Sequence, residues 1–133
     1  MTDGTPLVLL AEDDEDVRAL AEFVLRREGF EVTAVSDGEA ALAAAAERTP
    51  SVAVLDVSMP RMDGLEAARR LRERPEMSTV PIMLLTSHVT EADRERGRHA
   101  GADAQLDKPF SPAVLAERVR ALLAGRPTEG QSP

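Results

Sequence analysis

The chain of 133 residues contains no cysteine. It can therefore have no disulfide framework, no thiolate metal site and no cysteine nucleophile, so its chemistry must depend on oxygen and nitrogen atoms. Long apolar runs are also missing: none approaches the roughly 20 residues of a membrane span, and residues 1–6 have no signal-peptide pattern. These absences predict a soluble cytoplasmic protein without a membrane partner.

Positive charge is scarce as well. Lys and Arg number 16 against 24 Asp and Glu, which gives a formal net charge of −8. A charge of this sign disfavours direct binding to nucleic acid or to an anionic membrane. The length fits a single domain. We expect an N-terminal tail at residues 1–5, the domain at 6–124, and a flexible C-terminal tail at 125–133, where proline, glycine and polar residues gather.

Short apolar segments recur along the chain. Unbroken runs occupy residues 7–11, 52–55 and 82–85, as is typical of strands that are buried on both faces of a parallel sheet. Residues 31–35 alternate like a strand, and a weaker strand is expected near 103–106. Five strands are therefore predicted.

Segments with helical periodicity lie between the strands. After Asp14, Val17, Leu20, Ala21, Val24 and Leu25 form an apolar stripe at helical spacing, and Gly29 supplies a left-handed stop. The polar helix near 91–100 contains Gly97, so we expect it to be weak. The remaining helices are expected at 38–48, at 64–74 with Pro75 ending it, and at 112–124 after Ser111.

This alternation predicts an α/β fold: a doubly wound, five-stranded parallel sheet flanked by five helices, of the flavodoxin-like type. In such sheets the carboxyl ends of the strands form the binding crevice. Polar residues at those ends are the first candidates for chemistry.

The predicted strands end in acids, hydroxyls and one ammonium group. Crowded carboxylates repel one another, and a hard divalent cation such as Mg²⁺ relieves that repulsion. The cation, the lysine and a hydroxyl could together hold a phosphoryl group. The residues concerned are Glu12-Asp13-Asp14, Asp56, Thr86-Ser87 and Asp107-Lys108-Pro109.

Taken in order, these motifs resemble the receiver domain of two-component response regulators (CheY-like), over about residues 6–124. The motifs are Glu12-Asp13, Asp56 in VLDVSMPRMDG, Thr86 in PIMLLTS and Lys108 in DKPF. The resemblance implies that Asp56 accepts a phosphoryl group from a sensor histidine kinase or a phosphotransfer protein. It implies Mg²⁺ as cofactor, with Asp13 and Asp56 as direct ligands, Glu12 acting through water, and Ser58 contributing its backbone carbonyl.

The same resemblance assigns roles to other residues. Lys108 would pair with Asp56 at rest and with the phosphoryl group afterwards, and the Lys108-Pro109 bond resembles the cis peptide of the family. Thr86 would donate its hydroxyl to the phosphoryl oxygens. Asp14, at a helix start, fits an N-cap better than a metal ligand. Ser58 and His88 resemble positions that tune the lifetime of the acyl phosphate, although His88 also fits a solvated loop.

Two features depart from the family pattern. Receivers typically carry Tyr or Phe three residues before the lysine, where this chain has Gln105, so coupling to an output is expected to be atypical. A buried amide would need internal hydrogen-bond partners. Arg98 lies in a charged run that is either a solvated face or an altered partner surface, on which Arg98 and Gln105 would both lie. The helix at 91–100, the strand at 103–106 and the last helix would form that output face. We expect an unidentified downstream partner to bind there, and a homodimer could form through the same face.

Two alternatives of other classes remain. A Mg²⁺-dependent aspartyl-phosphate phosphohydrolase shares the nucleophile and the lysine, but usually has a second aspartate where Ser58 stands. A phosphorylation-independent scaffold with the receiver fold is the third reading. The complete set of acids, hydroxyl and lysine speaks against the scaffold, and we expect a phosphoacceptor domain rather than an enzyme.

Overall fold

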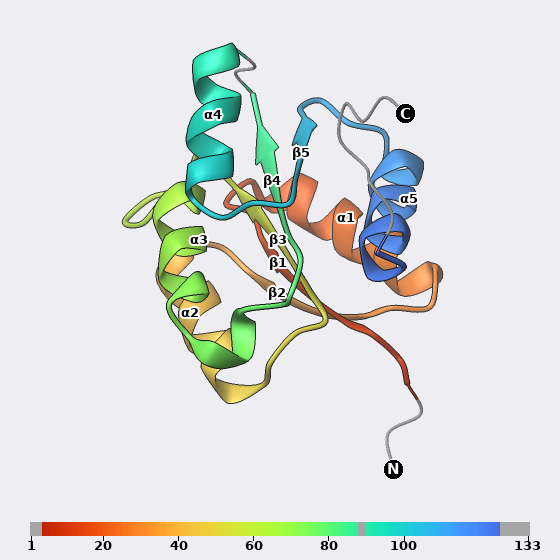
Figure 1. Cartoon of the computed structure of the whole chain (residues 1–133). Helices are drawn as coiled ribbons and strands as arrows, with labels where there is room; N and C mark the ends of the chain where they lie inside the picture. Colours follow the sequence, from red (N-terminus) through yellow and green to blue (C-terminus); the bar gives the residue numbers. More distant parts are fainter. Residues whose placement is uncertain (1–3, 88–89, 126–133) are drawn as a thin grey trace.

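A single parallel sheet forms the centre of the molecule (Figure 1). The computed structural model describes residues 4–87 and 90–125, and within them five strands pair in the order β2-β1-β3-β4-β5. All four pairings are parallel. The strands are β1 (Leu7–Ala11), β2 (Glu31–Val35), β3 (Val52–Asp56), β4 (Ile82–Thr86) and β5 (Ala104–Asp107).

Helices cover both faces of this sheet (Figure 1). One face carries α1 and α5, and the other carries α2, α3 and α4. Each of these five helices begins after an Asp, Ser or Thr whose side chain accepts a backbone N–H of the first turn, which satisfies part of the helix end. Their bounds are α1 (Glu15–Arg27), α2 (Gly38–Glu47), α3 (Gly64–Arg72), α4 (Glu91–His99) and α5 (Pro112–Leu123).

The predicted α/β architecture is confirmed, with differences at element ends. Helix α3 ends at Arg72 rather than near residue 74, and a 3₁₀ turn, Pro75–Met77, follows it. Strands β3 and β4 each extend one residue beyond the apolar run and so include Asp56 and Thr86. The sheet itself therefore holds these two side chains in place.

Alternation along the strands divides the core into two halves. Side chains such as Val8, Leu10 and Val54 pack with α1 and α5, whereas Leu9 and Leu55 pack with α2 and α3. All residues of β1, β3 and β4 are buried, as expected for strands covered on both faces.

One member of the predicted α1 stripe is exposed to solvent. Leu20 is 51% exposed. Together with Val17 and Ala21 it lines an apolar pocket of about 310 Å³, whose other wall includes Lys108. The sequence stripe spans a wider arc of the helix than the core covers, so its edge residue faces outward.

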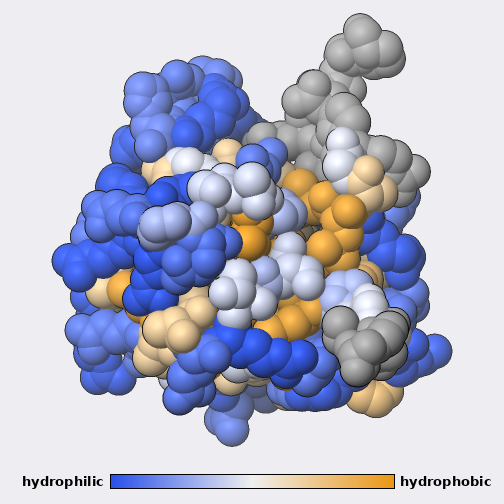
Figure 2. Space-filling model, turned by 60° about the horizontal axis from the view of Figure 1, so that its bottom comes forward, coloured by the Kyte–Doolittle hydropathy of each residue, from blue (hydrophilic) through white to orange (hydrophobic). Residues whose placement is uncertain are grey.

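Charged and polar residues dominate the outer surface. Figure 2 turns the bottom of Figure 1 toward the viewer and shows apolar residues gathered near the middle of the view, surrounded by hydrophilic ones. None of the helices in the described part of the chain is long and apolar enough to cross a lipid bilayer.

Candidate functional site

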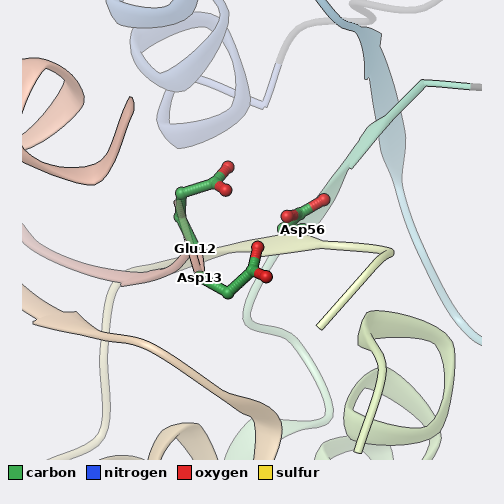
Figure 3. Close-up of side chains that lie close together, drawn as sticks. All are labelled: Glu12, Asp13 and Asp56. Carbon is green, nitrogen blue, oxygen red and sulfur yellow. The ribbon is translucent and has the colours of Figure 1, made fainter. Parts of the chain in front are cut away.

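Three carboxylates meet at the edge where β1 and β3 end (Figure 3). Glu12 and Asp13 follow β1 directly, and the pairing of Ala11 with Leu55 places them beside Asp56, the last residue of β3. One carboxylate oxygen from each of the three lies within 4.8 Å of the others. The fold thus brings together the expected acidic cluster, although Glu12 and Asp56 are 44 positions apart in the sequence.

Lys108 lies against two of these carboxylates. Its Nζ atom is 3.1 Å from Oε1 of Glu12 and 3.3 Å from Oδ2 of Asp56. The residue follows β5, and its backbone N–H donates to the carbonyl of Thr86 at 2.8 Å, which ties it to the end of β4. The Lys108-Pro109 bond is cis.

Burial of this cluster shifts the pKa values of its ionisable groups. Glu12 is fully buried and Asp56 is 2% exposed, whereas Asp13 is exposed. Burial raises the pKa of the Asp56 carboxyl to about 7, the nearby Glu12 carboxylate acts in the same direction, and the Lys108 ammonium opposes them. Burial acts to lower the pKa of Lys108, but its hydrogen bond to Glu12 and the charge of Asp56 raise it above its ordinary value.

The charges of the ionised cluster do not cancel. Three carboxylates and one ammonium sum to −2, so one divalent cation would bring the total to zero. The donors are carboxylate oxygens, one of them exposed and able to meet an ion that keeps part of its water, as Mg²⁺ does. Chemically, Glu12, Asp13 and Asp56 fit a magnesium site.

The residues around Glu12 fix its position. Its carboxylate accepts the backbone N–H of Asp14 at 3.0 Å. Asp14 itself caps α1, since its Oδ1 accepts the N–H groups of Asp16 and Val17, so its interpretation as an N-cap is confirmed. Arg18 donates to the carbonyl of Glu12 at 2.9 Å. Sequence reasoning gave Arg18 no such role, because a contact to a backbone carbonyl leaves no motif.

The loop after Asp56 packs tightly on the strand. The backbone N–H of Ser58 donates to Oδ1 of Asp56 at 3.2 Å. A Cβ at Gly64, the first residue of α3, would lie 2.4 Å from the carbonyl oxygen of Asp56, so only glycine fits there. Gly64 therefore allows the loop to pack against the site.

Thr86 and Gln105 share a cavity beside the cluster. It has a volume of about 170 Å³ and lies under the start of α4, with Ser58 also in its lining. Gln105 lines a second, outer groove of about 790 Å³ as well, so its side chain stands between the two spaces.

The amide of Gln105 is buried, the case for which internal hydrogen-bond partners are expected. The residue is only 5% exposed, and its Nε2 donates to the carbonyl of Arg94 at 2.9 Å. A Cβ at Gly97 would lie 2.5 Å from that Nε2. The buried amide thus has the internal partner that burial requires, and it occupies space that a glycine in α4 leaves open.

Arg98 does lie at the surface. It pairs with Glu95 at 2.7 Å and with Glu91 at 3.5 Å, and it lines the outer groove. His88 lies outside the described residues.

A comparison with known protein families agrees with this geometry. The model of the response regulator receiver domain matches residues 8–120. The transcriptional regulatory protein GltR of Pseudomonas aeruginosa is 43% identical over 116 residues, which are 87% of this chain and 48% of that protein. The chain thus spans about half the length of the curated relatives it matches.

Solved structures of the same fold are similar over nearly the whole chain. A putative response regulator from Chloroflexus aurantiacus has a TM-score of 0.85 and 36% identity, covering 90% of this chain and 98% of that one. The receiver domain of the sensor histidine kinase PA1611 from Pseudomonas aeruginosa has a TM-score of 0.82 and 33% identity, covering 92% and 99%. That structure holds a magnesium ion coordinated in its active site cleft.

Proposed function

The chain belongs to the response regulator receiver domain family, and we propose that Asp56 is its phosphoacceptor, loaded by a sensor histidine kinase or a phosphotransfer protein. The family is one of signalling phosphoacceptors rather than enzymes, which sets the phosphohydrolase alternative aside. The carrying observation is the contact of one ammonium, Lys108 Nζ, with two buried carboxylates at 3.1 and 3.3 Å, beside a third carboxylate within ligand distance.

Mg²⁺ is the proposed cofactor. Asp13 and Asp56 would hold it directly, Glu12 through water, and Ser58 through its backbone carbonyl. When bound, the ion neutralises negative charge on the carboxylates and on the phosphoryl oxygens. The surplus of −2 in the ionised cluster and the magnesium ion in the PA1611 receiver support this assignment.

The chain's own residues then perform the transfer. A carboxylate oxygen of Asp56 forms the new bond to phosphorus, while the bond between phosphorus and the imidazole nitrogen of the donor breaks and its electron pair stays on that nitrogen. Lys108 exchanges its contact with the carboxylate for one with the phosphoryl oxygens. Thr86, 6% exposed at the end of β4, donates its hydroxyl to another of them. Ser58 and His88 set how readily water reaches the acyl phosphate.

We propose that Gln105 transmits the conformational change at the phosphorylation site to the output face. Thr86 and Gln105 line the same 170 Å³ cavity, so a movement of the threonine toward a phosphoryl group changes the space available to the amide. Because Gln105 is hydrogen-bonded to Arg94, such a change would reach α4 and the outer groove near Arg98. The face formed by α4, β5 and α5 would then bind a downstream protein or a second copy of the chain.

Other expectations follow from the same proposal. A domain that receives its phosphoryl group from a kinase or phosphotransfer protein is expected in the cytoplasm. With a net charge of −8, the chain is not expected to bind nucleic acid directly. The relatives are named as transcriptional regulators, and this chain corresponds to about half of their length.

Acetyl phosphate provides the test. With Mg²⁺ present, intact-mass measurement of the wild type should show the gain of one phosphoryl group, whereas chelation of the ion should abolish it. Asp56→Asn should show no gain. Asp63→Asn is the matched control, because an amide still caps α3 and the acidic cluster is untouched. Equal labelling of wild type and Asp56→Asn would contradict the proposal, and no labelling of the wild type would favour the scaffold alternative.

A further inference from the structure

The loop between Asp56 and α3 contains one strained backbone position. Arg61 has a φ of 67°, and among the described residues no other residue apart from glycine has a positive φ. This conformation is unfavourable for a residue with a Cβ, and it persists only where surrounding contacts impose it. The contact that holds Arg61 therefore bears on the shape of the whole loop.

That contact comes from the start of α2. Nη2 of Arg61 donates to Oδ2 of Asp37 at 2.9 Å, across 24 residues of sequence. The Asp37 side chain is only 9% exposed, and its other oxygen accepts the N–H of Ala40 at 2.8 Å as the cap of α2. One carboxylate thus fixes both a helix end and the loop, and these two bonds hold the pKa of Asp37 below its usual value.

The two segments are also in close backbone contact. A Cβ at Gly38 would lie 2.5 Å from the carbonyl oxygen of Met62, so α2 approaches the loop as closely as a glycine permits. The neighbouring N–H of Met62 donates to the carbonyl of Pro60 at 2.7 Å. The loop is therefore held on the side away from Asp56 as well as at Gly64.

The same loop borders the acidic cluster. Five of its residues, from Val57 to Pro60 and Asp63, line an open basin of about 540 Å³ whose remaining lining residue is Asp13. It also carries Ser58, whose N–H donates to Asp56 and whose carbonyl is the proposed magnesium ligand. A change in the path of the loop displaces that carbonyl relative to the carboxylates.

We propose that Arg61 and Asp37 are positioning residues, whose ion pair holds the 57–63 loop in the path that makes the magnesium site. The inference rests on the proposed function, since it concerns the same site. Neither side chain touches the ion; both act through the backbone between Ser58 and Met62.

Calorimetric titration of Mg²⁺ into the metal-free protein tests the proposal. Arg61→Asn loses the ion pair but suits a positive φ, and Asp37→Asn loses the pair but keeps the cap on α2. We expect each to raise the Kd for Mg²⁺ about tenfold, as is typical when a residue behind a metal ligand is lost. The double variant should be no weaker than either single one, because the two residues act as a unit.

The sign of the two effects separates positioning from bulk electrostatics. If the residues acted only through their charge, removing the arginine would strengthen Mg²⁺ binding and removing the aspartate would weaken it. A fall in Kd for Arg61→Asn, or a Kd within twofold of wild type for both variants, would overturn the proposal.

Arg48→Asn is the matched control. It removes the ion pair of Arg48 with Glu31 at 2.6 Å, which lies where the strands begin, at the edge of the sheet opposite the loop, and it should leave the Kd unchanged. Circular dichroism confirms that each variant is folded at the assay temperature, and if one is not, the other carries the test. A wild type that binds no Mg²⁺ overturns the proposed metal site and this inference together, whereas normal binding by wild type and both variants overturns the positioning role alone.

Discussion

Arg72, where the strands begin, and Lys108, where they end, are both cations surrounded by oxygens, but their surroundings differ. Nε of Arg72 donates to the carbonyl of Gly101 at 3.0 Å, and Nη1 donates to those of Met77 and Val80 at 2.6 and 2.7 Å. Its Nη2 meets the carboxylate of Asp103 at 2.7 Å. One positive charge thus faces one negative charge, and the other acceptors are neutral.

Lys108 lies instead among more negative charge than it can neutralise. Glu12 and Asp56 contact it, and Asp13 lies beside them. The charge of Arg72 is balanced by Asp103, and its hydrogen bonds stabilise the fold. Around Lys108 the carboxylates outnumber the ammonium, so the folded protein keeps excess negative charge there. The comparison teaches that charge balance, rather than the presence of buried charge, distinguishes a structural cluster from a binding site.

The largest expected effect comes from removing Arg72, the cation whose charge is balanced. Arg72→Ala removes the hydrogen bonds to three backbone carbonyls and to Asp103, so the free energy of unfolding should fall by about 2–4 kcal/mol. Urea unfolding followed by far-ultraviolet circular dichroism measures it. Arg69→Ala on the same helix removes only an exposed pair with Glu66 and should cost about 0–1 kcal/mol. Equal losses in the two variants would contradict the structural role of Arg72.

The next prediction has the opposite sign. In metal-free solution near pH 8, Asp56→Asn removes one of the uncompensated charges, so the free energy of unfolding should rise by about 1–2 kcal/mol. Saturating Mg²⁺ should stabilise the wild type and shrink this difference. A metal-free Asp56→Asn protein that is less stable than the wild type would mean that the cluster is already balanced at rest.

The smallest expected effect concerns a neutral buried group, Gln105. In the wild type, Gly97→Ala gains helix propensity but displaces the amide from its bond to Arg94, and the two contributions of about 1 kcal/mol nearly cancel. In a Gln105→Ala background the same change should stabilise by about 1 kcal/mol. A double-mutant cycle from urea unfolding measures the difference. An identical effect in both backgrounds would show that the glycine and the amide are independent.

Local patterns in the sequence predicted most of the fold. Apolar runs, the apolar stripe that ends at Gly29 and the helix end before Pro75 all depend on residues close together in the sequence, so each could be interpreted from the sequence alone. The residues that gather at the carboxyl edge followed from the topology of a parallel sheet. Glu12, Asp13, Asp56, Thr86 and Lys108 were brought together as expected.

Contacts that depend on three-dimensional proximity could not be predicted. The bonds of Arg72 reach mostly backbone carbonyls, which no sequence motif marks. Leu20 falls within the helical stripe, but the width of the core, not periodicity, leaves it exposed. The packing of Gln105 against a glycine eight positions earlier, across the contact between α4 and β5, likewise leaves no pattern in the sequence.

The bond between Lys108 and Glu12 joins positions 96 residues apart, close to the two ends of the domain. During translation, position 56 leaves the ribosome well before position 108 has been added. A nascent chain at that stage carries the Asp56 carboxylate without its ammonium partner and without the last strand of the sheet. The site is therefore assembled only when synthesis of the domain is nearly finished, and a product truncated before residue 108 would lack it.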